Sequence, residues 1–303
     1  MLDLSVNVAG IKLENPIMPA SGVFGFGMEY LDFFDPNILG AIVLKGTTLE
    51  SRFGNLTPRV AESASGMINS IGLQNPGVDA VAETEIPLLR KTYSGVLIAN
   101  VCGFSESEYA QCCEKLDGLV EIIELNISCP NVHADGANFG SDARGTAIAV
   151  NAARKAVKKS KLFVKLSPNV TYITEIARTA ESEGADGLTL INTLLGMRIN
   201  IKTGKPVIAN RIGGLSGRAI LPVALRMIND TARVVKIPII GAGGVHSAET
   251  AVEMLMAGAS AVQIGAENLR NPMVMPEILA LLPYVLEEIG ASKITDIIGC
   301  SLS

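Results

Sequence analysis

The sequence predicts an α/β fold, a TIM (β/α)8 barrel with an N-terminal hairpin and insertions at the C-terminal face of the strands. Three observations predict it. Eight short apolar runs recur along the chain, segments with helical patterns separate most of them, and 48% of the 303 residues are hydrophobic against 18% charged. One α/β barrel typically needs about 250 residues, and strands that are buried on both faces form continuous apolar runs. We therefore expect a single domain over residues 1–303.

The eight runs are rich in β-branched residues, which is typical of buried strands. They are Pro16–Ser21, Ala41–Lys45, Val96–Asn100, Ile122–Ser128, Leu162–Ser167, Leu188–Asn192, Ile237–Gly241 and Ala261–Gly265. Between them, Ser105-Glu-Ser-Glu108 has the pattern of a capping box, and Gly184 and Gly258 indicate helix ends. Alternating strands and helices are typical of a parallel sheet that closes into a barrel.

Three further segments have expected places in this fold. Leu4–Val8 and Ile11–Leu13 flank Ala9-Gly10 and predict a structural hairpin before the first barrel strand. The connections 46–95 and 193–236 are too long for simple loops between a strand and a helix. Both follow the carboxyl ends of strands, where barrel enzymes place their active sites. We expect them to lie over such a site.

Composition and charge exclude several classes of protein. A net charge of −5 with scattered basic residues argues against a nucleic-acid surface. No run of about 18 apolar residues is free of charge, Gly and Pro, so we expect no membrane span. The first residues lack a secretion signal, which makes cytoplasm the expected location. With two His, and with Cys at 102, 112, 113, 129 and 300 in no C-x-x-C spacing, we expect no disulfide framework and no metal site on this chain.

Polar residues end most of the predicted strands. Val, Ile or Leu would fill a barrel core at these places, whereas polar residues there face a ligand. Six of the eight ends are polar: Ser21, Lys45, Asn100, Asn126, Lys165 and Asn192. Together they predict a binding site at one end of the barrel.

The last two strands run into glycines, in Ile240-Gly-Ala-Gly-Gly-Val245 and Ile264-Gly-Ala-Glu267. Glycine lets backbone N–H groups approach a phosphate, and the loops after strands seven and eight are the usual phosphate site of such barrels. Tight turns are the alternative interpretation. A phosphate site does not identify the ligand, because many barrels bind sugar phosphates. Lys165 favours a flavin, since a lysine here could stabilise the anionic reduced ring.

Cys129 is the candidate catalytic base. It follows a strand, precedes a proline and lies between Asn126 and Asn131. A thiol with an ordinary pKa near 8.5 is mostly protonated at pH 7, so the site must favour the thiolate, and Lys45 could supply the positive field. We interpret the other four cysteines as buried hydrophobes. The polar, glycine-bearing stretch 132–140 is typical of a lid that excludes water.

Eight motifs resemble the dihydroorotate dehydrogenases, over essentially the whole chain. They are Pro19-Ala-Ser-Gly22, Leu44-Lys-Gly46, Asn69-Ser-Ile-Gly-Leu-Gln-Asn75, Asn126-Ile-Ser-Cys-Pro-Asn131, Val164-Lys-Leu-Ser-Pro168, Ile191-Asn-Thr193, Gly213-Gly-Leu-Ser-Gly217 and Gly241-Ala-Gly-Gly244. The resemblance implies oxidation of dihydroorotate to orotate in pyrimidine biosynthesis, with FMN as the cofactor and Cys129 as the base.

The resemblance also implies site residues. The positions that would contact FMN are Ser21, Lys45, Gly46, Asn100, Asn126, Lys165, Ile191, Gly217, Gly243, Gly244, Gly265 and Ala266. The positions that would hold the substrate are Lys45, Asn69, Ser70, Ile71, Gly72, Leu73, Asn126, Asn192 and Thr193.

A cysteine at 129 resembles the soluble class of this family, because the membrane-associated class has Ser there and an N-terminal extension. Within that class, Lys45-Gly-Thr-Thr48, Asn126–Val132 and Gly213–Ile220 look closer to the NAD-linked type. That type implies a homodimer core in a heterotetramer, with FAD and a 2Fe-2S cluster on a partner subunit. The chain itself lacks cluster-spaced cysteines and a dinucleotide motif, so a partner chain would pass electrons to NAD.

Other readings stay open at this point. Two keep the flavin: a fumarate-using homodimer of the same family and a dihydropyrimidine dehydrogenase subunit. A third is a non-redox aldolase or isomerase barrel that uses Lys45 or Lys165 on a phosphorylated sugar. The last is a ligand-binding scaffold in which Cys129 is merely packed.

Overall fold

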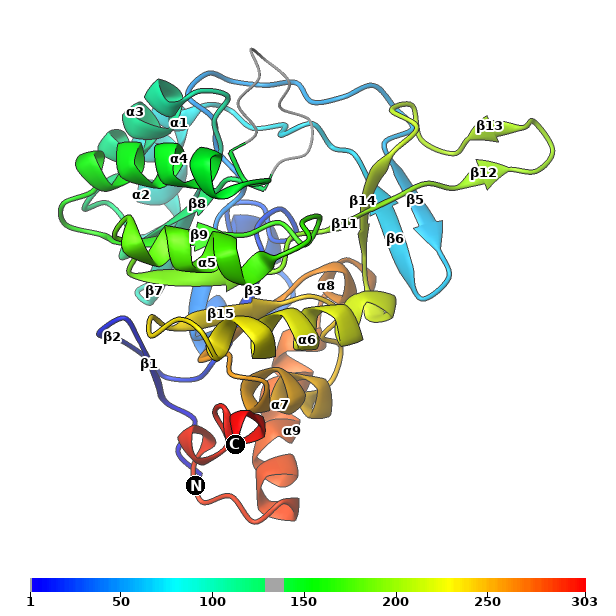
Figure 1. Cartoon of the computed structure of the whole chain (residues 1–303). Coiled ribbons are helices and arrows are strands. Elements are labelled where there is room, and N and C mark those ends of the chain that lie inside the picture. Colours follow the sequence, from blue (N-terminus) through cyan, green and yellow to red (C-terminus); the bar gives the residue numbers. More distant parts are fainter. Residues whose placement is uncertain (1, 129–138) are drawn as a thin grey trace.

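The computed structural model describes residues 2–128 and 139–303, and it confirms the predicted barrel (Figure 1). Its main sheet has the strand order β3-β16-β15-β10-β9-β8-β7-β4, and neighbouring strands pair in parallel. Gly40 N donates to Ile17 O at 2.9 Å and joins the two ends of the sheet. Each predicted run overlaps one strand: β3 Ile17–Pro19, β4 Ala41–Val43, β7 Val96–Val101, β8 Ile122–Asn126, β9 Lys161–Lys165, β10 Gly187–Leu190, β15 Ile239–Ala242 and β16 Ala261–Ile264.

Most of the barrel strands are buried on both faces. Every residue of β3, β4, β8, β10, β15 and β16 is buried. An inward and an outward apolar face together produce the continuous hydrophobic runs seen in the sequence.

Helices separate the strands and cover the barrel (Figure 1). They are α1 Val78–Ala80, the π-helical turn η3 Val81–Glu85, α2 Ile86–Leu89, α3 Glu106–Leu116, α4 Ala143–Ala156, α5 Ile173–Ser182, α6 Leu221–Ala232, α7 Ala248–Met256, α8 Ala266–Arg270 and α9 Val274–Glu288. Short 3-10 turns are η1 Met28–Tyr30, η2 Pro36–Ile38, η4 Arg218–Ile220, η5 Ile294–Asp296 and η6 Cys300–Leu302.

The predicted helix signals are confirmed with one correction. Gly184 and Gly258 follow α5 and α7 with φ of +93° and +118°. At α3, Ser105 Oγ accepts from Glu108 N at 3.2 Å, but the Glu108 carboxylate accepts from Phe104 N rather than from Ser105 N. The capping box predicted there is therefore only half formed, because the glutamate bonds one residue earlier in the chain.

The N-terminal hairpin is confirmed as well. It consists of β1 Val6–Val8 and β2 Ile11–Leu13, joined by Ala9 and Gly10 with φ of +54° and +87°. Two successive left-handed residues match the twist of an antiparallel pair.

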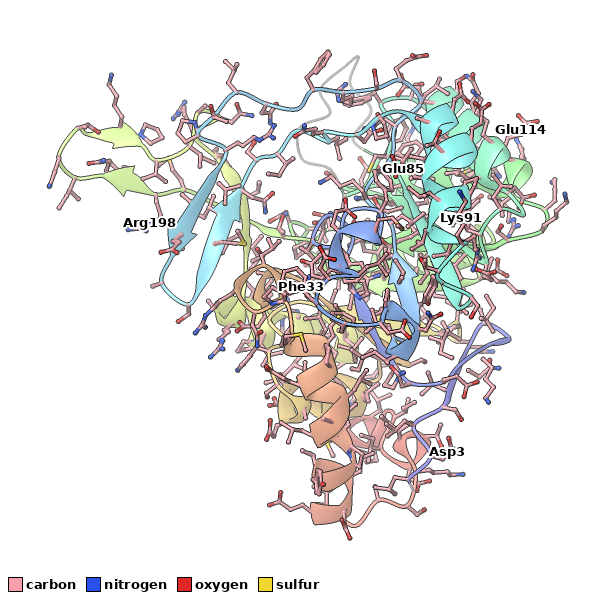
Figure 2. All side chains as sticks on the ribbon, turned by 180° about the vertical axis from the view of Figure 1, so that it is seen from behind. Asp3, Phe33, Glu85, Lys91, Glu114 and Arg198 are labelled. Carbon is pink, nitrogen blue, oxygen red and sulfur yellow. The ribbon has the colours of Figure 1, made fainter. Side chains whose placement is uncertain are left out.

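The two long connections meet in a second sheet, which the sequence did not predict. Its order is β11-β14-β6-β5, with β5 Val60–Ser63 and β6 Gly66–Asn69 from the first connection and β11 Leu194–Gly196 and β14 Gly213–Ser216 from the second. A hairpin of β12 Ile199–Asn200 and β13 Lys205–Pro206 extends from it (Figure 1). Figure 2 places Arg198 beside this sheet, where its guanidinium donates to Glu62 O at 2.6 Å.

The prediction that the other four cysteines are buried is confirmed for three of them and wrong for one. Cys102, Cys112 and Cys113 are buried as predicted, and burial raises the pKa of the Cys112 thiol to about 12. Cys300 is exposed, so the prediction that it packs in the core was wrong. It lies in the turn η6, which has no buried residues. In the described ranges, no helix has the length and the apolar character needed to cross a membrane.

Candidate active site

A cavity of about 360 Å³ lies at the carboxyl ends of the barrel strands, between the barrel and the second sheet. The structure brings together around it every predicted site residue that it describes. These are Ser21, Lys45, Gly46, Asn69, Ser70, Ile71, Gly72, Leu73, Asn100, Asn126, Lys165, Ile191, Asn192, Thr193, Gly217, Gly243, Gly244, Gly265 and Ala266. Cys129, Asn131 and most of the predicted lid lie outside the described residues.

The cavity is positively charged although the chain carries a net charge of −5. Lys45, Arg52 and Lys165 line it, and the described lining residues include no Asp or Glu. A concave site with charges of one sign concentrates ligands of the opposite sign. The geometry therefore favours an anionic ligand.

Lys45, two residues after the end of β4, is half-buried at this site. Burial lowers the pKa of its ammonium below the ordinary value, and the nearby Arg59 adds to this effect, whereas Cys102 opposes it. Within residues 2–128 and 139–303, no carboxylate lies within salt-bridge distance of Lys45. Its charge is therefore available to an anion that enters the cavity.

A ladder of three asparagines crosses the floor of the cavity. Asn126 Nδ2 donates to Asn100 Oδ1 at 3.3 Å, and Asn192 Nδ2 donates to Asn126 Oδ1 at 3.3 Å. Ser128 Oγ also donates to Asn126 Oδ1, at 2.7 Å. Asn100 lies in β7, Asn126 ends β8 and Asn192 follows β10. The strands β7, β8, β9 and β10 are consecutive in the parallel sheet, so these side chains lie at the same end of the barrel. Amides held in this way can match the donors and acceptors of a planar heterocycle.

Lys165 lies at the end of β9 and is almost fully buried. Its Nζ donates to Gln263 Oε1 at 3.2 Å and lies 3.6 Å from Glu124 Oε1. Sequence reasoning missed Glu124 and Gln263, because they lie inside strands rather than at strand ends. A signal was present, since each is a polar residue with an apolar residue on either side of it in its strand.

Glycines of three segments form the other end of the cavity. Gly244 has φ of +79°, and a Cβ added to it would lie 2.6 Å from Leu221 N. No acceptor among the described residues bonds the backbone N–H groups of Gly243 and Gly244, which lie between β15 and α7. Such N–H groups can bind a phosphate. Gly217, Gly265 and Ala266 lie in the same lining.

Lining residues with polar or aromatic side chains were also missed at three loop positions, Arg52, Asn55 and Phe104. The Arg52 guanidinium lies over the Phe104 ring at 4.4 Å from its centroid, and Asn55 Nδ2 donates to Ser70 O at 3.0 Å. All three come from loops, whose positions depend on tertiary packing rather than on a local sequence pattern.

Comparison with known proteins gives a consistent result. A family model described as dihydroorotate dehydrogenase matches residues 3–286. The chain is 52% identical over 300 residues to "Dihydroorotate dehydrogenase B (NAD(+)), catalytic subunit" of Bacillus pumilus, with 98% of this chain and 96% of that protein covered. A protein of the same name from Enterococcus faecalis is 50% identical over 297 residues, with 97% and 95% covered.

A solved structure supports the fold. The crystal structure of "DHODH in complex with ferulenol" from Eimeria tenella superposes with a TM-score of 0.84 and covers 99% of this chain and 88% of its own. At 23% identity, that similarity shows a shared fold.

Proposed function

This chain belongs to the dihydroorotate dehydrogenase family, and on that premise we propose that it oxidises dihydroorotate to orotate in pyrimidine biosynthesis. One observation supports the proposal above all. Cationic side chains, an asparagine ladder and a glycine-rich end converge on one cavity. Those groups suit a carboxylate, a planar ring with imide groups and a phosphate. Dihydroorotate has the carboxylate, and FMN has the phosphate and the planar ring.

The cavity fits FMN. Its volume of about 360 Å³ lies within the usual range for small-ligand sites, and its glycine end offers the N–H groups that a phosphate needs. When bound, FMN supplies the hydride acceptor. The residues that would hold it are Ser21, Lys45, Gly46, Asn100, Asn126, Lys165, Ile191, Gly217, Gly243, Gly244, Gly265 and Ala266.

The substrate would lie between the cofactor and the insertion loops. Lys45 attracts its carboxylate, while Asn126, Asn192 and Thr193 orient its ring amides together with the loop from Asn69 to Leu73. Cys129 removes the proton from C5 of dihydroorotate, and the developing charge lies in the positive field of Lys45. The base ends the step protonated, and orotate forms when C6 also loses a hydride, for which bound FMN would be the acceptor.

The electrons then leave through a partner. Both relatives cited above are named catalytic subunits of an NAD(+) enzyme, which supports a partner subunit for this chain. We propose that this partner carries FAD and a 2Fe-2S cluster, that two copies of each subunit form a heterotetramer, and that the assembly is cytoplasmic. Reoxidation of the reduced enzyme by fumarate, and not by NAD with the partner, would instead favour the fumarate-using homodimer.

A visible spectrum tests the proposed function. The purified chain should be yellow, and anaerobic dihydroorotate should bleach its flavin bands, whereas orotate alone should only perturb them. A colourless protein would contradict the proposal and favour a phosphosugar barrel. A yellow protein that dihydroorotate does not bleach would favour a ligand-binding scaffold.

Lys45 predicts a pH dependence of orotate binding. The protonated lysine attracts the carboxylate, so affinity should fall as the pH rises through the pKa of Lys45. Since burial lowers that pKa, the fall should begin below the pH at which an ordinary lysine, with a pKa of about 10.4, loses its proton. The measurement is the dissociation constant of orotate from pH 7 upward.

Two substitutions serve as controls for this pH profile. Lys45→Arg should remove the fall, because a guanidinium stays charged. Below the pKa of Lys45, Lys45→Met should bind orotate at least about tenfold more weakly than the wild type, because hydrogen bonds to charged groups contribute about 1.5–3 kcal/mol, and its affinity should not fall as the pH rises. The same profile in Lys45→Met and in the wild type would show that another group titrates.

A further inference from the structure

A carboxylate lies inside the barrel, beneath the cavity. Glu124 is in the middle of β8 and is 0% exposed, and it is not a lining residue of the cavity. Barrel interiors are normally filled by Val, Ile and Leu. Burying a carboxylate is costly, and an apolar residue of similar volume would often give equal or greater stability. The position of Glu124 therefore calls for a role other than filling the core.

Four other strands direct polar side chains at this carboxylate. Oε1 accepts from Asn100 Nδ2 at 2.6 Å. Oε2 accepts from Thr189 Oγ1 at 2.8 Å and from Gln263 Nε2 at 2.7 Å. Lys165 Nζ lies 3.6 Å from Oε1. These partners belong to β7, β10, β16 and β9, so Glu124 links five of the eight barrel strands.

One group of contacts holds Lys165. Its Nζ donates to Gln263 Oε1, and the same Gln263 amide donates through Nε2 to Glu124. Among the described residues, Glu124 is the carboxylate that pairs with Lys165, and it compensates the charge of this ammonium in a buried position. The carboxylate thus sets both the place of this ammonium and the net field that it exerts in the cavity.

The other group of contacts orients the asparagine ladder. A carboxylate only accepts hydrogen bonds, so Glu124 requires Asn100 to turn Nδ2 toward it. The Oδ1 atom of Asn100 then accepts from Asn126, and the Oδ1 atom of Asn126 accepts from Asn192. The orientation of each amide follows from the one before it. Glu124 therefore determines which donors and acceptors the floor of the cavity presents.

We propose that Glu124 is a positioning residue of the flavin site, which sets the charge balance at Lys165 and the orientation of the Asn100–Asn126–Asn192 ladder without contacting either ligand. The inference rests on the proposed function, because it takes Lys165 and Asn100 as contacts of FMN. It predicts that the charge of Glu124 controls the reduction potential of the flavin and that the length of the Glu124 side chain controls substrate binding.

Glu124→Gln removes the charge at nearly constant volume. Lys165 then loses its nearest anion, so its positive field on the flavin grows and favours the more negative reduced ring. We expect the equilibrium with a reference dye to shift at least tenfold toward reduced flavin, which corresponds to about 30 mV for a two-electron couple. The measurement is a dye-equilibrated anaerobic reduction of the purified chain with FMN bound.

Glu124→Asp separates the effect of the charge from the effect of side-chain length. The aspartate keeps the negative charge but is one methylene shorter and withdraws from Asn100. Its equilibrium with the dye should stay within about threefold of wild type, because the charge remains in the barrel. Its affinity for orotate should fall at least about fivefold, because the ladder loses its fixed end.

Glu121→Gln is the matched control. Glu121 immediately precedes β8, and its carboxylate pairs with Arg90 at 2.8 Å in a partly exposed position. The same substitution there should change neither the potential nor orotate binding.

Each outcome decides between the inference and the proposed function. A wild-type chain that dihydroorotate reduces, beside a Glu124→Gln chain with the same potential, overturns the role of Glu124 and leaves the function intact. Where Glu124→Gln does not fold, a Glu124→Asp chain with wild-type orotate affinity overturns it. A wild-type chain that binds no FMN overturns both.

Discussion

Replacing Cys129 with Ala should slow the reduction of the flavin by dihydroorotate about a thousandfold, while FMN and orotate still bind. A positioned general base typically contributes 10²–10⁴ in rate, and alanine has no group that can take the C5 proton. Binding should persist because the cations, the asparagine ladder and the glycine end lie on other residues. Anaerobic stopped-flow measurement of the flavin absorbance gives the rate, and a titration with orotate gives the affinity.

Cys300→Ala is the control for this experiment. Cys300 is an exposed thiol in η6 and is not a lining residue of the cavity, so its loss should leave the rate unchanged. Flavin reduction at the wild-type rate in the Cys129→Ala chain would assign the proton abstraction to another group. Loss of FMN or orotate binding would instead give Cys129 a role in holding the site together.

The barrel could be predicted because strands that are buried on both faces have a local sequence pattern, a continuous apolar run. A strand such as Ala41–Val43 is an apolar run in the sequence and a fully buried strand in the structure. The second sheet has no such pattern. Gly214 of β14 pairs with Asn69 of β6, and these residues are 145 positions apart. Pairing at that distance depends on how the barrel brings the two connections together, so no local pattern could reveal it.

The residues of the candidate site differ in the same way, because some have a local sequence signal and others do not. Residues at strand ends could be predicted, because a barrel places all carboxyl ends at one face, and the structure places them around one cavity. Glu124 and Gln263 lie in strand interiors, where an apolar residue is expected, and their meaning becomes clear only when five strands close around them. Arg52 and Phe104 come from loops and meet through tertiary contacts.

Replacing Lys165 with Met should both destabilise the fold and weaken FMN binding. The substitution leaves Glu124 as a buried carboxylate without its nearest cation. Breaking a buried ion pair by removing one partner typically costs about 3–5 kcal/mol, so the free energy of unfolding of the FMN-free chain should fall by about 3 kcal/mol. FMN should bind at least about tenfold more weakly, because the site loses a charged hydrogen-bond donor. Urea denaturation and FMN titration measure the two effects.

Lys161→Met is the control for the Lys165→Met prediction. Lys161 begins the same strand, β9, and its Nζ lies 3.7 Å from Asp186 in a partly exposed pair. Such pairs contribute about 0–1 kcal/mol, so this chain should unfold and bind FMN much as the wild type does.

The double variant Lys165→Met/Glu124→Gln separates the two roles of the lysine. It leaves no lone buried charge, so most of the lost stability should return, whereas FMN affinity should stay low because the ammonium is still absent. If the double variant is as unstable as Lys165→Met, the uncompensated charge of Glu124 is not the cause of the loss. If Lys165→Met binds FMN as tightly as the wild type does, Lys165 has no part in holding the cofactor. Recovery of stability without recovery of binding is the result that assigns the buried charge to the fold and the ammonium to the flavin.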